Sequence, residues 1–224
     1  MQIYFILVEP TFPENIGAAA RAIKTMGFDK LRLVNPTDHL VKEARWLAHA
    51  SNEILENAEI FSSFDEAVTD IDLTIASTAK RRSVKFDYLE VSDLPNLLSE
   101  KKRSINNAAI VFGKEESGLN NDIIRKCDLA SYIPMKTKYP SLNLSQAAMI
   151  YAYELSKLNI ETLQKKESVA DEIVFPVFKQ KLDSLLLEMR IEKNENLYHR
   201  ILERSNLLGD DDLHLALSIL NRLV

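Results

Sequence analysis

Short apolar runs alternate with amphipathic stretches over most of the chain. Each run has the length of a strand, and each stretch repeats its apolar residues at helical spacing, as Ile16, Ala19 and Ile23 do. The runs predict strands over residues 2–8, 31–34, 58–61, 73–77, 108–112 and 129–133. The spacing predicts helices between Pro13 and Gly27, over 40–50, 64–68 and 94–98, from residue 120, and over 144–158.

Strands that alternate with helices require crossover connections, so the pattern predicts an α/β fold. Its sheet should be mostly parallel, with helices on both faces. In such sheets ligands bind beyond the carboxyl ends of the strands. We therefore expect the functional residues in the loops after residues 8, 77, 112 and 133.

The pattern changes near residue 160. Residues 161–171 are polar and predict a linker, and apolar residues after them recur only at helical spacing. We therefore divide the chain into a domain over 1–160 and a helical C-terminal extension over 161–224. Asp210 is expected to cap the last helix. The helical stripes predict a small bundle, which a dimer could share.

Composition restricts the function further. The net charge of −5 argues against a protein that coats nucleic acid with a broad basic surface. Cys127 is the only cysteine, which predicts a buried small side chain and a reducing, cytoplasmic setting. The four scattered histidines do not have ligand spacing, so no metal site is expected. No apolar run approaches the ~20 residues that a membrane span needs, and no secretory signal is apparent.

Three segments carry unusual hydrogen-bonding capacity at the expected loops. Residues 13–21 open the first helix and include Asn15 and Arg21. Residues 111–119 run from the end of a strand into a loop and carry two of the chain's five glycines. Residues 140–147 precede the long helix. Taken singly, each has an ordinary structural explanation: Asn15, Ser141 or Asn143 as a helix cap, a glycine turn, and an arginine on a helix surface.

Together the segments resemble the three motifs of the SPOUT RNA methyltransferases. Asn-Ile-Gly-Ala with Arg21 resembles the first motif, Phe-Gly-Lys-Glu-Glu-Ser-Gly-Leu the second, and Ser-Leu-Asn-Leu-Ser-Gln-Ala the third, in the same order. The TrmJ/LasT-like branch, whose members also carry a helical C-terminal extension, is the most similar one. The resemblance covers residues 1 to about 158.

This resemblance implies a trefoil knot, a homodimer and S-adenosylmethionine bound in the knot. The cofactor-binding residues that it implies are Ser77, Thr78, Ala79, Gly113, Ile133, Ser141, Leu142 and Asn143. The catalytic residues that it implies are Arg21, Asn15, Glu115 and Asn143, with Arg21 acting at the other subunit's cofactor. Two roles remain open for Arg21. It is either the base that removes the hydroxyl proton or, since a guanidinium stays protonated in proteins, the group that holds an RNA phosphate.

The implied activity is methylation of a ribose 2′-hydroxyl of tRNA, at a cytidine or uridine of the anticodon loop. Three alternatives remain: ribosomal RNA as substrate, a base methyltransferase on the same fold, and a non-catalytic RNA-binding protein. Because the chain is acidic, we expect RNA to meet a narrow basic strip. Its candidate residues are Arg21, Lys24, Arg81, Arg82, Lys136 and Lys138.

Overall fold

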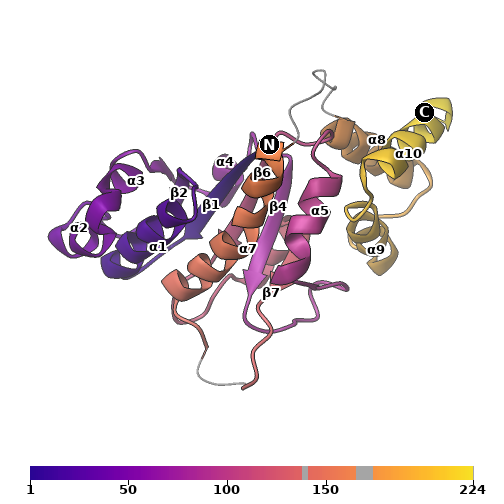
Figure 1. Ribbon diagram of the computed structural model, residues 1–224. Coiled ribbons are helices and arrows are strands. Elements are labelled where there is room, and N and C mark those ends of the chain that lie inside the picture. The colour runs from indigo at the N-terminus through magenta and orange to yellow at the C-terminus, as the bar shows by residue number, and fades with distance from the viewer. Residues whose placement is uncertain (138–140, 165–173, 224) are drawn as a thin grey trace.

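The computed structural model describes residues 1–137, 141–164 and 174–223, which form one sheet flanked by helices (Figure 1). Within these residues, the seven strands pair in parallel in the order β3-β2-β1-β6-β4-β7-β5. The strands are β1 (Gln2–Val8), β2 (Lys30–Val34), β3 (Glu59–Phe61), β4 (Leu73–Thr78), β5 (Leu89–Glu90), β6 (Asn107–Phe112) and β7 (Leu129–Tyr132). The predicted parallel α/β fold is confirmed.

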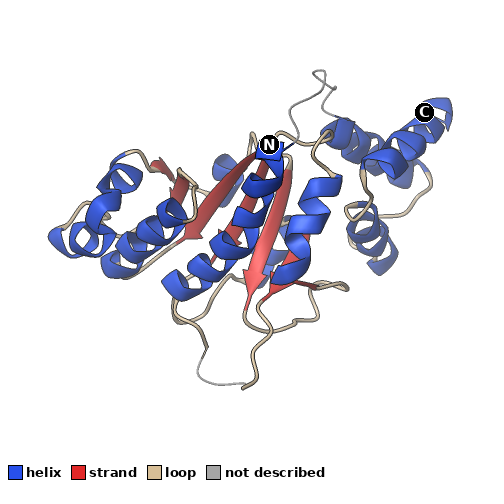
Figure 2. Cartoon of the chain, viewed as in Figure 1, coloured by secondary structure: helices blue, strands red, loops and turns tan. Residues whose placement is uncertain are grey.

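Helices cover both faces of the sheet, as Figure 2 shows. Up to β7 they are α1 (Pro13–Thr25), α2 (Lys42–Ala48), α3 (Asn52–Glu56), α4 (Phe64–Ala67), α5 (Leu94–Glu100) and α6 (Asn121–Lys126), with 3-10 turns at His49–Ser51 and Val91–Asp93. After β7 come α7 (Leu144–Gln164), α8 (Val174–Glu188), α9 (Asn196–Ser205) and α10 (Asp210–Leu223).

Alternate residues of the central strands belong to two separate cores. Phe5 and Leu7 of β1 pack in the core that includes α1, α5 and α7, whereas Ile6 and Val8 pack in the core that includes α4 and α6. Successive side chains of a strand point to opposite faces, so a strand covered on both sides is apolar without interruption. This explains why the central strands appear in the sequence as continuous apolar runs.

The N-terminal helix α1 packs closely against α2. A Cβ atom added at Gly17 would lie 2.0 Å from the backbone oxygen of Ala44, so only glycine allows this approach. At its other end, α1 stops at Gly27, whose φ of 88° few other residues adopt. The predicted end of this helix is confirmed, and the glycine of the first motif has a packing role.

The substitution Gly17→Ala is expected to lower the free energy of unfolding by about 1–3 kcal/mol, because the added methyl group overpacks the α1–α2 contact. Helix propensity alone predicts the opposite sign, a gain of about 1 kcal/mol. Urea unfolding of both proteins therefore decides between the two effects by sign. A more stable variant would show that α2 can move away at little cost.

The sequence analysis missed one strand and misplaced the start of one linker. The strand β5 was not predicted, because two residues are too few to show a periodic pattern. The proposed linker over 161–171 fails at its start, since α7 continues to Gln164. Its residues there are ordinary helix formers, which can extend a helix already nucleated upstream. The remainder of that linker, 165–171, lies outside the described residues.

The helices α8, α9 and α10, here called the C-terminal helices, lie beside α5 at one end of the sheet (Figure 1). Asp210 does not cap α10 from outside as predicted: it is the first residue of the helix. Its carboxylate accepts hydrogen bonds from the Arg103 amide at 2.9 Å and from the Ser104 hydroxyl. The buried Lys101 donates to the backbone oxygen of Leu208. These contacts fasten the C-terminal helices to the segment between α5 and β6.

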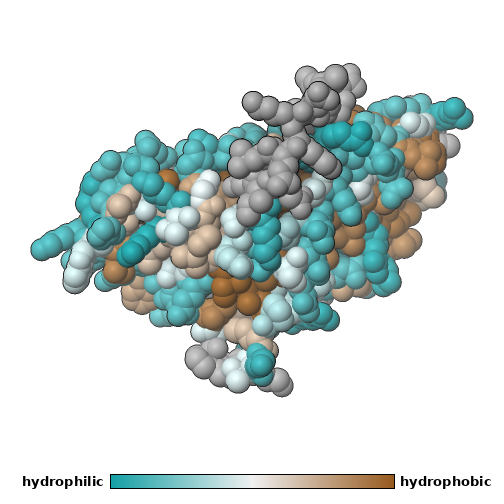
Figure 3. All heavy atoms as spheres, viewed as in Figure 1, coloured by the Kyte–Doolittle hydropathy of each residue, from teal (hydrophilic) through white to brown (hydrophobic). Residues whose placement is uncertain are grey.

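The apolar stripes of the C-terminal helices are only partly covered. Phe178, Leu182, Leu213 and Leu220 are buried, as the predicted bundle requires. Leu215, by contrast, is exposed, and Figure 3 shows apolar side chains on these helices at the right of the view. Among the described residues, no helix is long and apolar enough to cross a membrane.

Candidate active site

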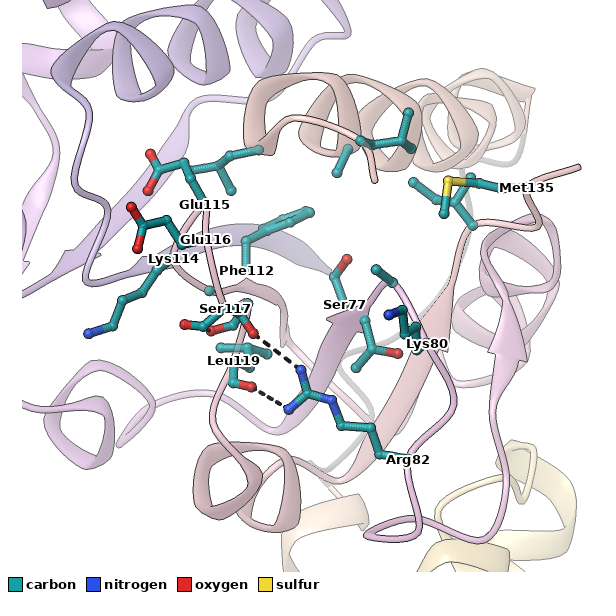
Figure 4. A pocket seen from close by; sticks show the side chains of 18 residues that line it. Ser77, Lys80, Arg82, Phe112, Lys114, Glu115, Glu116, Ser117, Leu119 and Met135 are labelled. Carbon is teal, nitrogen blue, oxygen red and sulfur yellow. Dashed lines mark hydrogen bonds between the residues drawn. The ribbon is translucent and has the colours of Figure 1, made fainter. Parts of the chain in front are cut away.

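A cavity of about 230 Å³ opens where β4, β6 and β7 end. Because parallel strands bring their carboxyl ends to one edge, the loops after these strands meet there. Figure 4 shows the side chains around it. The cavity is lined by Ser77, Thr78, Ala79, Lys80, Arg82, Phe112, Gly113, Lys114, Glu115, Glu116, Ser117, Gly118, Leu119, Ile133, Met135, Leu142, Leu144 and Ala147.

Most of the cofactor residues implied by the resemblance line this cavity. They are Ser77, Thr78, Ala79, Gly113, Ile133 and Leu142. Ser141 and Asn143 flank Leu142 but are not part of the wall, and both are exposed. The fold thus brings together four separate segments, 77–82, 112–119, 133–135 and 142–147, at the position that the sequence indicated.

The loop after β6 folds tightly over its own start. A Cβ atom added at Gly113 would lie 2.1 Å from the backbone carbon of Gly118 and 2.1 Å from the nitrogen of Leu119. The Gly118 amide donates to the Lys114 oxygen at 2.8 Å, and Gly118 itself has a φ of 67°. Both glycines of the second motif are therefore required by the backbone, one for close approach and one for conformation.

Arg82 joins this loop to the loop after β4. Its guanidinium donates to the backbone oxygens of Leu119 at 2.8 Å and Ser117 at 3.2 Å (Figure 4). The Tyr88 hydroxyl accepts from the Arg82 amide at 2.9 Å and donates to the Arg82 oxygen at 2.8 Å. Arg82 thus holds two walls of the cavity together.

The basic strip expected for RNA is therefore partly engaged within the protein. Besides Arg82, Arg81 stacks 4.9 Å from the Tyr132 ring centroid and donates to its hydroxyl at 2.9 Å. Lys24 pairs with Glu53 at 2.7 Å. Lys138 lies outside the described residues. These contacts leave Arg21 and Lys136 as strip candidates to which the structure of the described residues assigns no polar side-chain partner.

Three predicted catalytic residues form one chain of hydrogen bonds. Glu115 accepts from the Asn15 side-chain amide at 2.9 Å and from the Thr11 hydroxyl and amide at 2.7 and 3.0 Å. The Asn15 oxygen in turn accepts from the Asn143 side-chain amide at 2.8 Å. Each of the three comes from a different motif, so this chain ties all three motifs together beside the cavity.

Asn143 also caps α7, which begins at Leu144. Its side-chain oxygen accepts from the Ser145 amide at 2.8 Å, and the Gln146 side chain accepts from the Asn143 amide at 3.0 Å. This reciprocal arrangement is a capping box, which fixes where the helix starts. The interpretation of Asn143 as a cap is therefore confirmed. The side-chain oxygen of Asn143 forms the cap, and its side-chain nitrogen remains free to donate to Asn15. Asn15 itself lies inside α1 and caps nothing, because Phe12 occupies the N-cap position.

Arg21 stands apart from this group. It lies on the exposed side of α1 and does not line the cavity. Within the described part of the chain it has no side-chain hydrogen bond or ion pair. The structure thus brings Asn15, Glu115 and Asn143 together and leaves the guanidinium of Arg21 available to solvent.

The hydrogen bonds at Glu115 lower the pKa of its carboxyl. Burial alone would raise this pKa, but the bonds donated by Asn15 and Thr11 favour the charged form more strongly. Glu115 therefore remains a carboxylate that holds loops in place. Nothing in its surroundings prepares it to take up a proton near neutral pH.

The substitution Glu115→Gln is expected to lower the free energy of unfolding by about 1–3 kcal/mol at pH 7, because an amide cannot accept all of these hydrogen bonds. A lowered folded-state pKa gives stability that is complete above the ordinary glutamate pKa of about 4.3 and fades as the pH falls through the lowered value. Urea unfolding at pH 7 and in acid should show the difference between the two proteins shrinking in acid. The exposed neighbour variant Glu116→Gln is the control, and a pH-independent difference would contradict the expectation.

Two fully buried hydroxyl groups lie close to a third one that lines the cavity. The Tyr151 hydroxyl of α7 lies beside those of Ser77 and Ser131, and neither the Tyr151 nor the Ser131 hydroxyl forms a hydrogen bond of normal geometry within the described residues. Burial raises the pKa of Tyr151 to about 12, so the phenol stays neutral. The Tyr151 ring meets Phe112 edge to face at 5.3 Å between centroids.

Known proteins identify the family of this chain. The sequence model of the SpoU rRNA methylase family matches residues 2–153, which include all three motifs and every strand. The chain belongs to the SpoU rRNA methylase family. It is accordingly an RNA methyltransferase.

Individual relatives agree with this membership. The chain is 40% identical to the uncharacterized tRNA/rRNA methyltransferase LasT of Escherichia coli, over 95% of this chain and 92% of the relative. It is 34% identical to the tRNA (cytidine/uridine-2′-O-)-methyltransferase TrmJ of Pectobacterium atrosepticum, over 83% and 79%. A probable methylase family protein from Haemophilus influenzae has a similar structure, with a TM-score of 0.69, 29% identity and coverage of 98% and 94%.

Several residues in and next to the cavity were not predicted from the sequence. Arg82 was noticed only as one charge in a basic cluster, and Tyr151 only as one position of an apolar helical stripe. Phe112 appeared as the last residue of a strand. Their partners are backbone oxygens, buried hydroxyls and another ring, none of which leaves a spacing pattern in the sequence.

Proposed function

We propose that this protein transfers a methyl group from S-adenosylmethionine to a ribose 2′-hydroxyl of tRNA, at a cytidine or uridine of the anticodon loop. The observation that carries the proposal is the meeting of the three motifs at one cavity, through Asn15, Glu115 and Asn143. The similarity to TrmJ of Pectobacterium atrosepticum supports the choice of tRNA and of a pyrimidine.

The cavity fits the proposed cofactor chemically. Phe112, Ile133 and Leu142 offer apolar surface for a flat base. Ser77 and Thr78 also line the cavity, and the buried hydroxyl of Tyr151 lies beside that of Ser77. The close approach at Gly113 lets the chain contact a ligand with its backbone. S-adenosylmethionine supplies an activated methyl group on a sulfonium sulfur.

The protein's own residues position the reacting groups. Glu115 and Asn15 hold the N-terminal end of α1 against the loop after β6. Arg21 holds an RNA phosphate and stabilises the negative charge that develops on the ribose oxygen as the hydroxyl proton passes to solvent. Holding two reactants in line can by itself account for about 7–11 kcal/mol of the barrier.

We also propose that the enzyme acts as a homodimer. Arg21 is exposed and does not line the cavity of its own chain, so it is available to a second subunit. Phe12 and Tyr153 are large apolar side chains at α1 and α7 that remain exposed in one chain. A dimer interface over these two helices would cover them and bring Arg21 to the partner's cavity.

Three further parts of the proposal follow from family membership. The loops after β4, β6 and β7 form a trefoil knot, the C-terminal helices α8, α9 and α10 act as a helical extension in place of the expected range 161–224, and the protein works in the cytoplasm. The buried, unpaired Cys127 supports a reducing compartment. Its burial raises the pKa of the thiol to about 12, so it is not a nucleophile.

Ribosomal RNA is the second candidate substrate, because the LasT relative is described as a tRNA/rRNA methyltransferase. The test is mass spectrometry of nucleosides from tRNA and ribosomal RNA, each incubated with the pure protein and methyl-labelled S-adenosylmethionine. Label in 2′-O-methylcytidine or 2′-O-methyluridine from tRNA is the expected result. Label only in ribosomal RNA would show that ribosomal RNA, and not tRNA, is the substrate. A labelled base would show that the enzyme methylates a base and not the ribose.

A further inference from the structure

The C-terminal helix α9 contacts the loop that follows β4. This loop, residues 79–88, begins in the cavity wall and ends before β5. One carboxylate oxygen of Glu203 accepts hydrogen bonds from the amides of Phe86 at 2.8 Å and Asp87 at 3.3 Å. Glu203 is more than a hundred residues away in sequence, so the contact exists only in the folded chain.

Glu203 is a buried acid, with an exposed fraction of 4%. Its second oxygen lies 3.6 Å from the ammonium of Lys85, a side chain of the same loop that is equally buried. A buried carboxylate is costly unless every charge and lone pair has a partner. Here two amides and one cation supply them, and all three belong to the 79–88 loop. The geometry of the loop is therefore coupled to the position of α9.

The same loop is continuous with the cavity. Next to the contact with Glu203, Tyr88 holds Arg82 through two hydrogen bonds to its backbone. Arg82 in turn holds the oxygens of Leu119 and Ser117 in the loop after β6. A sequence of direct contacts therefore leads from α9 to both walls of the cavity.

The attachment of the C-terminal helices does not depend on Glu203. Asp210 and Lys101 fasten them near α5. The Asn206 side-chain amide donates to the backbone oxygen of Asp128 at 3.2 Å, and the Lys179 ammonium pairs with the Asp128 carboxylate at 3.0 Å. Removing the Glu203 carboxylate should therefore free the amides of Phe86 and Asp87 and leave the helices docked, while Arg204 keeps its ion pair with the Asp87 carboxylate at 3.0 Å.

We propose that Glu203 is a positioning residue, through which the C-terminal helices hold the 79–88 loop in the shape that binds the cofactor. The inference rests on the proposed function, because it takes the cavity to be the cofactor site. It gives the C-terminal helices a role within their own subunit, independent of any contact with RNA. Loss of this contact should affect the cofactor and spare the RNA.

The test compares Glu203→Ala, Glu203→Gln and the control Asp211→Ala, which removes an exposed ion pair with Arg103. Glu203→Ala should weaken S-adenosylhomocysteine binding in calorimetry, and raise the KM for S-adenosylmethionine, by roughly tenfold, the order expected when a buried acceptor is lost. The KM for tRNA should not change. Glu203→Gln keeps an oxygen for both amides, so it should bind within about threefold of the unchanged protein.

Hydrogen exchange supplies a readout independent of activity. The Phe86 and Asp87 amides should be protected in the unchanged protein and exchange faster in Glu203→Ala. The amide of Arg103, bonded to Asp210, should remain protected if the C-terminal helices stay docked. If Glu203→Ala fails to fold, Glu203→Asp replaces it, because its shorter carboxylate cannot reach both amides.

Normal cofactor affinity in a folded Glu203→Ala protein whose two loop amides exchange freely would overturn the inference. An equal rise in the KM values for cofactor and tRNA would also overturn it, since that indicates a general loss of structure. The variant Gly113→Ala separates this failure from failure of the proposed function. If Gly113→Ala loses cofactor binding and Glu203→Ala does not, only the inference fails; if both bind normally, the cavity is not the cofactor site.

Discussion

The substitution Arg21→Ala is expected to lower kcat for methyl transfer to tRNA by about 100- to 1,000-fold, the cost of removing one group that stabilises developing charge. Arg21 is exposed on α1, does not line its own cavity and makes no polar side-chain contact within the described part of the chain. The affinity for S-adenosylhomocysteine and the melting temperature should therefore remain unchanged. Single-turnover kinetics with saturating cofactor, together with calorimetry, measures both quantities.

Arg125→Ala is the matched control, because Arg125 is also an exposed helical arginine and pairs with Asp122 on its own helix α6. This variant should methylate tRNA at the normal rate. A loss of cofactor binding in Arg21→Ala would contradict the assigned role. Normal turnover would exclude Arg21 from the reaction and return it to the ordinary surface arginine that its exposure alone suggests.

Mixing variants tests whether Arg21 acts on the partner subunit. Co-expressed Arg21→Ala and Gly113→Ala chains should form hybrid dimers in which one cavity retains both its own Gly113 and the partner's Arg21. With random pairing, activity should recover to about a quarter of normal, because half of the symmetric dimers are hybrids with one complete site. If Arg21 acts within its own chain, an Arg21→Ala subunit still lacks its arginine and a Gly113→Ala subunit its cofactor, so the mixture should stay inactive.

The substitution Gly113→Ala is expected to abolish measurable cofactor binding and to lower the free energy of unfolding by about 1–3 kcal/mol. The added Cβ would lie 2.1 Å from backbone atoms of Gly118 and Leu119, and backbone cannot move aside as a flexible side chain can. The loop after β6 must therefore open, which moves Glu115 away from Thr11 and Asn15. Calorimetry with S-adenosylhomocysteine and urea unfolding measure the two effects.

Gly209→Ala provides the matched control, because the nearest atom to an added Cβ there is 3.6 Å away. Both stability and cofactor binding should be preserved in that variant. Tight cofactor binding by Gly113→Ala would mean that the loop relaxes without cost, and the cavity would lose its assignment.

The order of elements and the three motif segments were predictable from the sequence. Doubly covered strands such as β1 and β6 are continuous apolar runs because both of their faces are buried. Gly27 indicated the end of α1 because an αL stop favours glycine. Asn143 could be identified as a cap because capping is a local interaction over three residues. Each of these features depends on neighbours in the sequence.

Interactions between distant segments were not predictable. Asp210 was expected to satisfy its own helix, but its carboxylate binds Arg103 and Ser104 across the molecule. The two-residue strand β5 forms only because β7 lies beside it. Neither outcome has a local signal, since what decides it is the free energy of burying one segment against another.

The candidate site also combines features that the sequence predicts with features that depend on the tertiary structure. Its residue types and its place at the carboxyl ends of the strands were predictable from the sequence, because the motif residues and the order of the strands along the chain can be recognised from neighbouring residues. The roles of Arg82 and Glu203 came only from the tertiary structure, because both bind backbone groups of distant loops. Nearly every residue carries such backbone groups, so the sequence does not indicate which amide or carbonyl a distant side chain will bind. Chain topology brings those groups within reach, and burial then makes the contacts specific.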